Sequence, residues 1–249
     1  MNFKDLFSGQ ASSYARFRPR YPAPLFTWLG TLVPRRQVAV DVGSGNGQAA
    51  TDLAGVFEHV VAIDPSASQL AHGEALPNLE YRKAAAEETG LDEGSADLVV
   101  AAQAFHWFDH AAFFSETRRI VRPGGALALW CYGLAAVTPE LDALVHELYE
   151  TELGAYWEPE RRLVESGYRT IAVPFEELPT PAFAMEVAWT LPELVGYLGT
   201  WSALRLYLEK HAADGDNPLE RMFPRLERAW GTATKRRISW PLGLRAFRL

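Results

Sequence analysis

Several features are scarce or lacking in this sequence, and each narrows the class of protein. Among 249 residues there is one cysteine, Cys131, which excludes an internal disulfide framework and suits a reducing compartment such as the cytoplasm. No apolar run approaches the roughly 20 residues that a membrane span needs. Lys4 and Asp5 interrupt any apolar stretch of a signal peptide. A soluble, cytoplasmic protein without a membrane partner is therefore expected.

Positive charge is also in short supply. Lys and Arg number 24 against 31 Asp and Glu, so the net charge is −7, and no basic tract stands out. This balance argues against nucleic acid or an anionic membrane surface as the main partner. A small-molecule substrate is the better expectation, and the oligomeric state is left open.

What the sequence does contain is an alternation of short apolar runs with helical patterns. Such runs, separated by helical segments, indicate βαβ units and a mainly parallel sheet that is covered on both faces. Strands are expected at 38–42, 60–64, 79–84, 96–102, 126–132, 183–190 and 236–249. Helices are expected at 23–32, from the glycines to about 54, and at 111–121, 139–170 and 191–230, the last broken near 214–218.

The stretch "DVGSGNG" (41–47) lies between an expected strand and an expected helix. Its three glycines leave backbone N–H groups uncovered and allow a ligand to approach the chain closely. The next expected strand ends in Asp64, 21 positions after Gly43. A carboxylate at that strand end can accept hydrogen bonds from ribose hydroxyls. Strand, glycines, helix, strand and acid in this order predict a nucleoside site.

The nature of the nucleoside depends on the glycine register. A dehydrogenase fingerprint, G-x-G-x-x-G, would need glycine where Gln48 stands, and Gly47 comes one residue early. Asp41 suits a ligand with positive charge, such as an ammonium or sulfonium, and would repel a pyrophosphate. An NAD-dependent oxidoreductase and a strand–helix turn without a ligand are kept as alternatives.

At these positions the sequence resembles the class I S-adenosylmethionine (SAM)-dependent methyltransferases, whose first motif is D/E-x-G-x-G-x-G. The resemblance continues through Asp64, "AAAEETGL" (84–91), "SADLVVAAQAFHWF" (95–108) and "RRIVRPGGALAL" (118–129). It covers roughly residues 38–130. The stretches "YARFRPRYP" (14–22) and "LGTWSA" (198–203) look like a narrower subgroup of trans-aconitate-type small-molecule methyltransferases.

The resemblance implies a fold and a cofactor. The fold is α/β, Rossmann-like and doubly wound, with a mostly parallel seven-stranded sheet, helices on both faces and a helical insertion or cap. One methyltransferase domain over 1–249 would comprise an N-terminal lid and helix (1–34), a SAM-binding core (35–132), and the helical insertion or cap with the last strands (133–249). SAM would be held by Tyr14, Arg18, Asp41, Gly43, Ser44, Gly45, Gly47, Asp64, Pro65, Ala86, Glu87, Gln103, Ala104 and Phe105.

The lid has a simpler alternative. Arg16, Arg18 and Arg20 alternate through a stretch that prolines keep out of a continuous helix, so they could form a solvated face. In the lid, Tyr14 and Arg18 would contact the cofactor, with Arg18 facing its carboxylate.

The stretch "AAQAFHWFDH" (101–110) would line the methyl end of the cofactor site. His106 and Trp107 are the catalytic candidates, with His106 acting as base, as hydrogen-bond donor or only as a packed side chain. His106 and His110 share a helical face, but Trp107 replaces the Glu of zinc peptidases and no third ligand is evident, so no metal is expected.

The methyl acceptor is less well defined by the sequence. Tyr21, Trp201 and Arg205 are candidate acceptor contacts, whereas Tyr197 is expected in the core. The acceptor could be a carboxylate, a hydroxyl or an amine, attacked in line by displacement at the methyl carbon. A catalytically silent SAM-binding protein is the remaining alternative.

Overall fold

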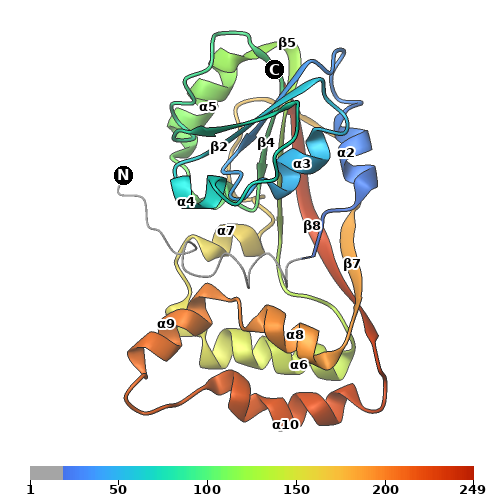
Figure 1. Ribbon diagram of the computed structural model, residues 1–249, viewed down its shortest axis with the longest axis vertical. Coiled ribbons are helices and arrows are strands. Elements are labelled where there is room, and N and C mark those ends of the chain that lie inside the picture. The colour runs from blue at the N-terminus through green and yellow to red at the C-terminus, as the bar shows by residue number, and fades with distance from the viewer. Residues whose placement is uncertain (1–18) are drawn as a thin grey trace.

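The computed structural model describes residues 19–249, and Figure 1 shows a sheet-containing core joined to a layer of helices that forms a cap. Two expected cofactor contacts, Tyr14 and Arg18, and most of the expected lid lie outside the described residues.

The core contains one mixed sheet with the strand order β3-β2-β1-β4-β5-β8-β6. Strands β1 to β5 pair in parallel, and β8 runs antiparallel to β5 and β6. The strands are β1 (Val38–Val42), β2 (His59–Asp64), β3 (Leu79–Lys83), β4 (Ala96–Ala102), β5 (Val121–Tyr132), β6 (Glu176–Leu178), β7 (Ala184–Trp189) and β8 (Arg236–Arg248). This seven-strand path confirms the expected Rossmann-like, mostly parallel sheet.

The eighth strand, β7, lies off this path and pairs with residues 236–241 of β8. Strand β6 was not expected, because its three residues include two glutamates and carry no apolar pattern. It is nevertheless held as an edge strand by antiparallel pairing with the end of β8.

The apolar runs of β1 and β4 follow from burial on both faces of the sheet. Alternate residues point to two separate hydrophobic clusters, so that Leu98 and Val100 pack on one side and Val99 and Ala101 on the other. Helices α2 (Ala23–Leu29) and α3 (Gln48–Leu53) contribute buried residues to the first cluster. Helices α5 (His110–Ile120) and α7 (Arg161–Glu165) cover the second. A single turn, α4 (Ala67–Leu70), follows β2, and the side chain of Ser66 caps its N-terminus.

The two long helices expected in the second half of the chain are shorter in the structure. The first divides into α6 (Pro139–His146), a π-helical segment η3 (Glu147–Glu152), a 3-10 turn η4 (Gly154–Tyr156) and α7, with Pro159 in the break. The second breaks near 214–218 as expected, between α9 (Ser202–Lys210) and α10 (Pro218–Trp230), and has a further, unexpected break that separates α8 (Leu191–Leu198) from α9.

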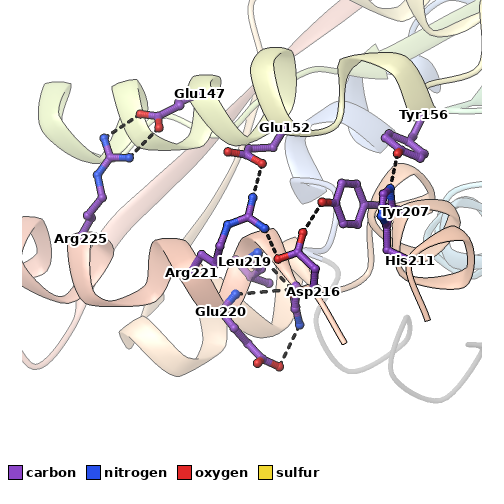
Figure 2. A network of polar contacts seen from close by, with 11 residues as sticks. Glu147, Glu152, Tyr156, Tyr207, His211, Asp216, Leu219, Glu220, Arg221 and Arg225 are labelled. Atoms are coloured by element: carbon purple, nitrogen blue, oxygen red, sulfur yellow. Dashed lines mark hydrogen bonds and ion pairs between the residues drawn. The ribbon is translucent and has the colours of Figure 1, made fainter. Parts of the chain in front are cut away.

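The cap is held by an apolar face of α10 and by ion pairs at its edge. Leu219, Met222 and Leu226 are buried on α10, which packs against α6 and α8. Arg225 donates to both carboxylate oxygens of Glu147, at 2.6 and 2.7 Å, and Arg221 donates to Glu152 at 2.5 Å; Figure 2 shows these side chains. The ion pairs are solvent-exposed, so the apolar contacts supply most of the stability.

The antiparallel pair of β7 and β8 extends from the core to the cap (Figure 1). Within residues 19–249, no helix combines the length and apolar composition needed to cross a bilayer.

Candidate active site

A cavity of about 530 Å³ lies at the carboxyl ends of β1, β2 and β4, where it meets the cap. The chain leaves β1 toward β2 on one side, and β4 lies on the other, so this is the switch point of the sheet where α/β folds bind ligands. The expected site residues that line it are Tyr21, Asp41, Gly43, Ser44, Gly45, Asp64, Pro65, Ala86, Glu87, Gln103, Ala104, His106, Trp107 and Trp201.

The glycine loop after β1 is shaped by left-handed backbone conformations. Gly43 and Gly45 have φ values of 70° and 58°, which glycine adopts without the strain of a side chain. A Cβ at Gly43 would lie 2.5 Å from the Cβ of Ala104, so the loop packs directly on the segment after β4. At Gly45 the nearest atom would be 4.0 Å away, and the backbone there is open to a ligand.

Asp64 ties the glycine loop to the end of β2. One carboxylate oxygen accepts the backbone N–H of Gly45 at 2.9 Å, and the other accepts that of Ser66 at 2.8 Å. Each carboxylate oxygen can accept more than one hydrogen bond, so Asp64 retains capacity for hydroxyl groups of a ligand.

Asp41 is fully buried, and neither carboxylate oxygen forms a hydrogen bond with a residue in the range 19–249. Burial raises the pKa of this carboxyl to about 7; the nearby backbone amide of Ala50 opposes the shift, and the charge of Asp64 adds to it. The hydroxyl of Ser44, on the same loop, likewise has no partner in the described part of the chain. Two buried polar groups without partners at one cavity indicate a site for a polar ligand.

Gln103 fixes the segment after β4. Its backbone has a φ of 54°, which is rare for a residue with a side chain. The side-chain amide accepts from the backbone N–H of Tyr132 at 2.8 Å and donates to the carbonyl of Tyr132 at 3.2 Å. This clamp to the end of β5 holds the following residues, Ala104 to Trp107, at the cavity wall.

His106 is buried at this wall. Its Nδ1 lies 3.0 Å from the hydroxyl of Tyr168, and its ring lies 4.8 Å from that of Trp107. Burial, together with the charges of Arg161 and His110, lowers the pKa of His106 to about 3, so the imidazole is neutral near pH 7. Nε2 makes no hydrogen bond with any residue of the described chain.

The second histidine of this stretch does not join His106 in a metal site. His110 Nε2 lies 3.1 Å from the carbonyl oxygen of Phe105. In residues 19–249, no group of three His, Cys, Asp or Glu side chains is placed to hold a metal ion.

Three expected contacts do not line the cavity. The Phe105 side chain is fully buried in an aromatic cluster with Tyr168, so any cofactor contact there falls to its backbone. Gly47 caps α3 and packs on Tyr81. Arg205 pairs with Glu209 at 2.9 Å along α9, because the i, i+4 spacing brings the two charges together on the helix surface.

Sequence reasoning missed part of the cap wall. Trp157, Glu158, Glu160 and Arg161 line the cavity between η4 and α7, and Tyr197 lines it from α8. The available signal was Pro159, which breaks an otherwise helical pattern and produces an irregular segment with two acids and an arginine beside it.

Comparison with known proteins shows to which family this chain belongs. The family model described as a methyltransferase domain matches residues 40–129. A Dictyostelium discoideum protein named as a methyltransferase is 36% identical over 211 residues, which cover 83% of this chain and 80% of that protein. The chain belongs to the class I SAM-dependent methyltransferases.

Two further similarities support this placement of the methyltransferase. The solved structure of a type II methyltransferase from Anaeromyxobacter dehalogenans has a TM-score of 0.86 and 46% identity, and covers 93% of this chain and 98% of that one. An uncharacterised methyltransferase of Mycobacterium tuberculosis is 40% identical over 124 residues, which is 49% of this chain and 50% of that protein. Family membership removes the NAD-dependent oxidoreductase from consideration.

The residues at the cavity fit SAM, the cofactor of this methyltransferase. The buried, unpartnered carboxyl of Asp41 suits a ligand with an ammonium and a sulfonium group. Asp64 stands at the end of β2, and the open backbone at Gly45 lies beside it. When bound, SAM supplies a methyl group on a positively charged sulfur.

Proposed function

We propose that this methyltransferase transfers the methyl group of SAM to a small-molecule acceptor. The observation that carries the proposal is the roof of the cavity, which the cap builds from Trp157, Arg161, Tyr197 and Trp201. A site of about 530 Å³ falls within the range of small-molecule pockets. A small acceptor that shares the cavity with the cofactor is consistent with this volume.

The lining also disfavours a nucleic acid as acceptor. Five acids of the described chain, Asp41, Asp64, Glu87, Glu158 and Glu160, line the cavity. A phosphate backbone needs cationic contacts along its path, and acids would repel it. The single cysteine, which is free and buried, supports our expectation of a cytoplasmic enzyme.

We assign the cofactor contacts by their position around the cavity. Asp64 would accept the ribose hydroxyls, Ala86 and Glu87 would lie along adenine, and Asp41 would face the cationic part of the cofactor. Gln103 and Ala104 would border the methyl end. Tyr14 and Arg18 would contact SAM from the lid, which makes residues 1–34 a separate functional segment before the core (35–132) and the cap with the last strands (133–249).

His106 serves, in this proposal, as a hydrogen-bonding group at the acceptor. A histidine with a pKa of about 3 is a weak base at neutral pH. Burial keeps the pKa of Tyr168 well above its ordinary value, so its hydroxyl keeps its proton and can donate to Nδ1. The imidazole proton then resides on Nε2, where it can orient an acceptor oxygen. Trp107 excludes water beside it, which aids a displacement that loses charge.

The resemblance to trans-aconitate-type enzymes stays a prediction. Its stretch at 198–203 includes Trp201, which lines the cavity, but its other stretch lies largely outside the described residues. The acceptor group, whether carboxylate, hydroxyl or amine, is open at this level.

A methyl-transfer screen tests the proposed function. The full chain is incubated with SAM that carries a radiolabelled methyl group and with panels of small carboxylic acids, phenols and amines, and with RNA and DNA. Label is expected in at least one small molecule. Asp64→Ala should lose SAM binding and transfer, whereas the exposed Asp92→Ala should match the wild type. Transfer to nucleic acid alone would overturn the proposal, and SAM binding without any transfer would favour the silent alternative.

A further inference from the structure

The cap brings a single cation to the cavity. Arg161, the first residue of α7, is the one Lys or Arg among the described residues that line it. Figure 1 shows α7, which Arg161 begins, between the sheet and the cap helices.

The guanidinium of Arg161 is held by aromatic neighbours. Its Nε donates to the hydroxyl of Tyr149 at 3.0 Å, and that hydroxyl donates to Glu165 at 2.5 Å. Its central carbon lies 5.6 Å from the ring centroid of Tyr149 and 5.2 Å from that of Trp157. The hydrogen bond engages the Nε side of the guanidinium, and the rings of Tyr149 and Trp157 lie against it. Together these contacts fix the orientation of the planar group.

The other edge of the guanidinium is uncommitted. The two terminal nitrogens of Arg161 form no hydrogen bond or ion pair with any residue of 19–249. A fixed guanidinium with two free N–H donors matches the two oxygens of a carboxylate. Helix α7, which Arg161 begins, contacts the 105–107 turn that carries His106, so in our assignment of the cofactor Arg161 lies beside the methyl end rather than the ribose end.

Aromatic rings form part of the wall around Arg161. The rings of Trp157 and Trp201 lie 5.5 Å apart between centroids, and Tyr149 packs at 5.8 Å from Trp201. Glu158 and Glu160 also line this end of the cavity. The formal charges of these two acids outweigh that of Arg161, which disfavours a polyanion, so a ligand carboxylate is favoured only where it contacts the guanidinium directly.

We infer that Arg161, with Trp157 and Trp201, forms an acceptor subsite for a small monocarboxylate that has a flat apolar body. The inference rests on the proposed function, since it names the substrate class of the same cavity. The carboxylate pairs with the terminal nitrogens of Arg161, and the apolar body packs on the indole rings.

Binding of matched acids and amides tests the subsite. Benzoate, cinnamate, 4-hydroxycinnamate and hexanoate are titrated calorimetrically into the full chain saturated with S-adenosylhomocysteine, each beside its uncharged amide. Since removing one partner of a desolvated charge pair weakens binding by about 30-fold or more, at least one acid should bind that much tighter than its amide. Arg161→Gln should abolish the preference, and Arg161→Lys should restore part of it. The neighbouring Arg162→Gln, an exposed control, should match the wild type.

The outcomes separate the subsite from the proposed function. If S-adenosylhomocysteine does not bind the wild type, the proposed function fails, and acid binding that depends on Arg161 can still be measured. If the cofactor product binds but no acid does, or amides bind equally well, the subsite is overturned. An equal loss of S-adenosylhomocysteine affinity in Arg161→Gln would also overturn it, because Arg161 would then hold the cofactor carboxylate. Unchanged thermal unfolding of the variants excludes misfolding as the cause.

Discussion

The hydroxyl of Tyr168 lies 3.0 Å from Nδ1 of His106, although 62 residues separate them in the chain. Tyr168 is fully buried in the turn after α7 and has a φ of 61°. Packing of the surrounding core stabilises this strained backbone. The hydroxyl of Tyr168 then holds the imidazole in one orientation at the cavity wall.

The first prediction concerns the pH dependence that His106 gives to methyl transfer. With a pKa of about 3, His106 stays neutral from pH 5.5 to 8, so its titration should not shape the profile of kcat/KM in that range. His106→Gln keeps a hydrogen-bonding amide and should retain SAM affinity and part of the turnover. Tyr168→Phe should lower kcat by about 10-fold with SAM affinity retained, since a lost hydrogen bond of about 1 kcal/mol or more frees the ring. A pH profile with an inflection near 6.5 that disappears in His106→Gln would show that His106 is the base.

The second prediction concerns Asp41 and stability. Its pKa is raised to about 7 in the folded chain, above the ordinary value of 3.8, so the folded state holds this proton more tightly than the unfolded state. The stability linked to that proton is complete below pH 4 and is lost as the pH rises toward and past 7. Asp41→Asn should therefore raise the free energy of unfolding at pH 8 by up to about 4 kcal/mol, and by less at pH 5. Urea unfolding at both pH values checks this, and an equal effect at the two would contradict it.

The same residue gives a third prediction, for cofactor binding. A cationic ligand favours the ionised carboxyl, so SAM should bind the wild type more tightly at pH 8 than at pH 6. Asp41→Asn should bind SAM more weakly and lose most of this pH dependence. Calorimetric titration of SAM at the two pH values measures both effects. If Asp41→Asn is more stable but its SAM affinity depends on pH as strongly as that of the wild type, Asp41 does not face the cationic part of the cofactor.

The fourth prediction compares two glycines of the same loop. Gly43→Ala combines a left-handed backbone with a Cβ placed 2.5 Å from that of Ala104, and should destabilise the fold by about 3 kcal/mol or more. Gly45→Ala has the left-handed strain without the clash and should lower stability by about 1–2 kcal/mol. Its main effect should be weaker SAM binding, because the added Cβ would cover the exposed backbone of residue 45 that faces the cavity. Equal losses of stability in the two variants would contradict the packing described for Gly43.

The fifth prediction separates buried from exposed polar contacts. Asp97 is 3% exposed, accepts the backbone N–H groups of Gln37 and Val38, and pairs with Arg122 at 2.7 Å, so it joins the starts of β1, β4 and β5. Asp97→Ala should lower the free energy of unfolding by about 3 kcal/mol, because buried donors lose their acceptor. Glu147→Gln, at the exposed pair with Arg225 (Figure 2), should leave it nearly unchanged. Chemical unfolding measures the free energy of unfolding of both variants. Similar losses in the two would contradict the prediction.

The core of the fold was predictable because its signals are local. A strand covered on both faces needs a continuous apolar run, and "VAVDV" and "ADLVVAA" supply one each. The glycines at 43 and 45 report left-handed backbone, and Asp64 reports the strand end, so these residues could be assigned to one edge of the sheet. The expected lengths of the cap helices were too long, since the first is broken at Pro159 and the second also breaks between Leu198 and Ser202.

The sequence by itself determined the parallel core, the glycine loop and the order of the cofactor-type residues, because each depends on residues close together along the chain. Only the tertiary structure decided that Phe105 turns into the core, that Tyr168 orients His106, and that Arg161 reaches the cavity from the cap. The reason is physical: burial, charge and hydrogen bonding at a site act across space, and partners 62 residues apart leave no periodicity that a sequence can display.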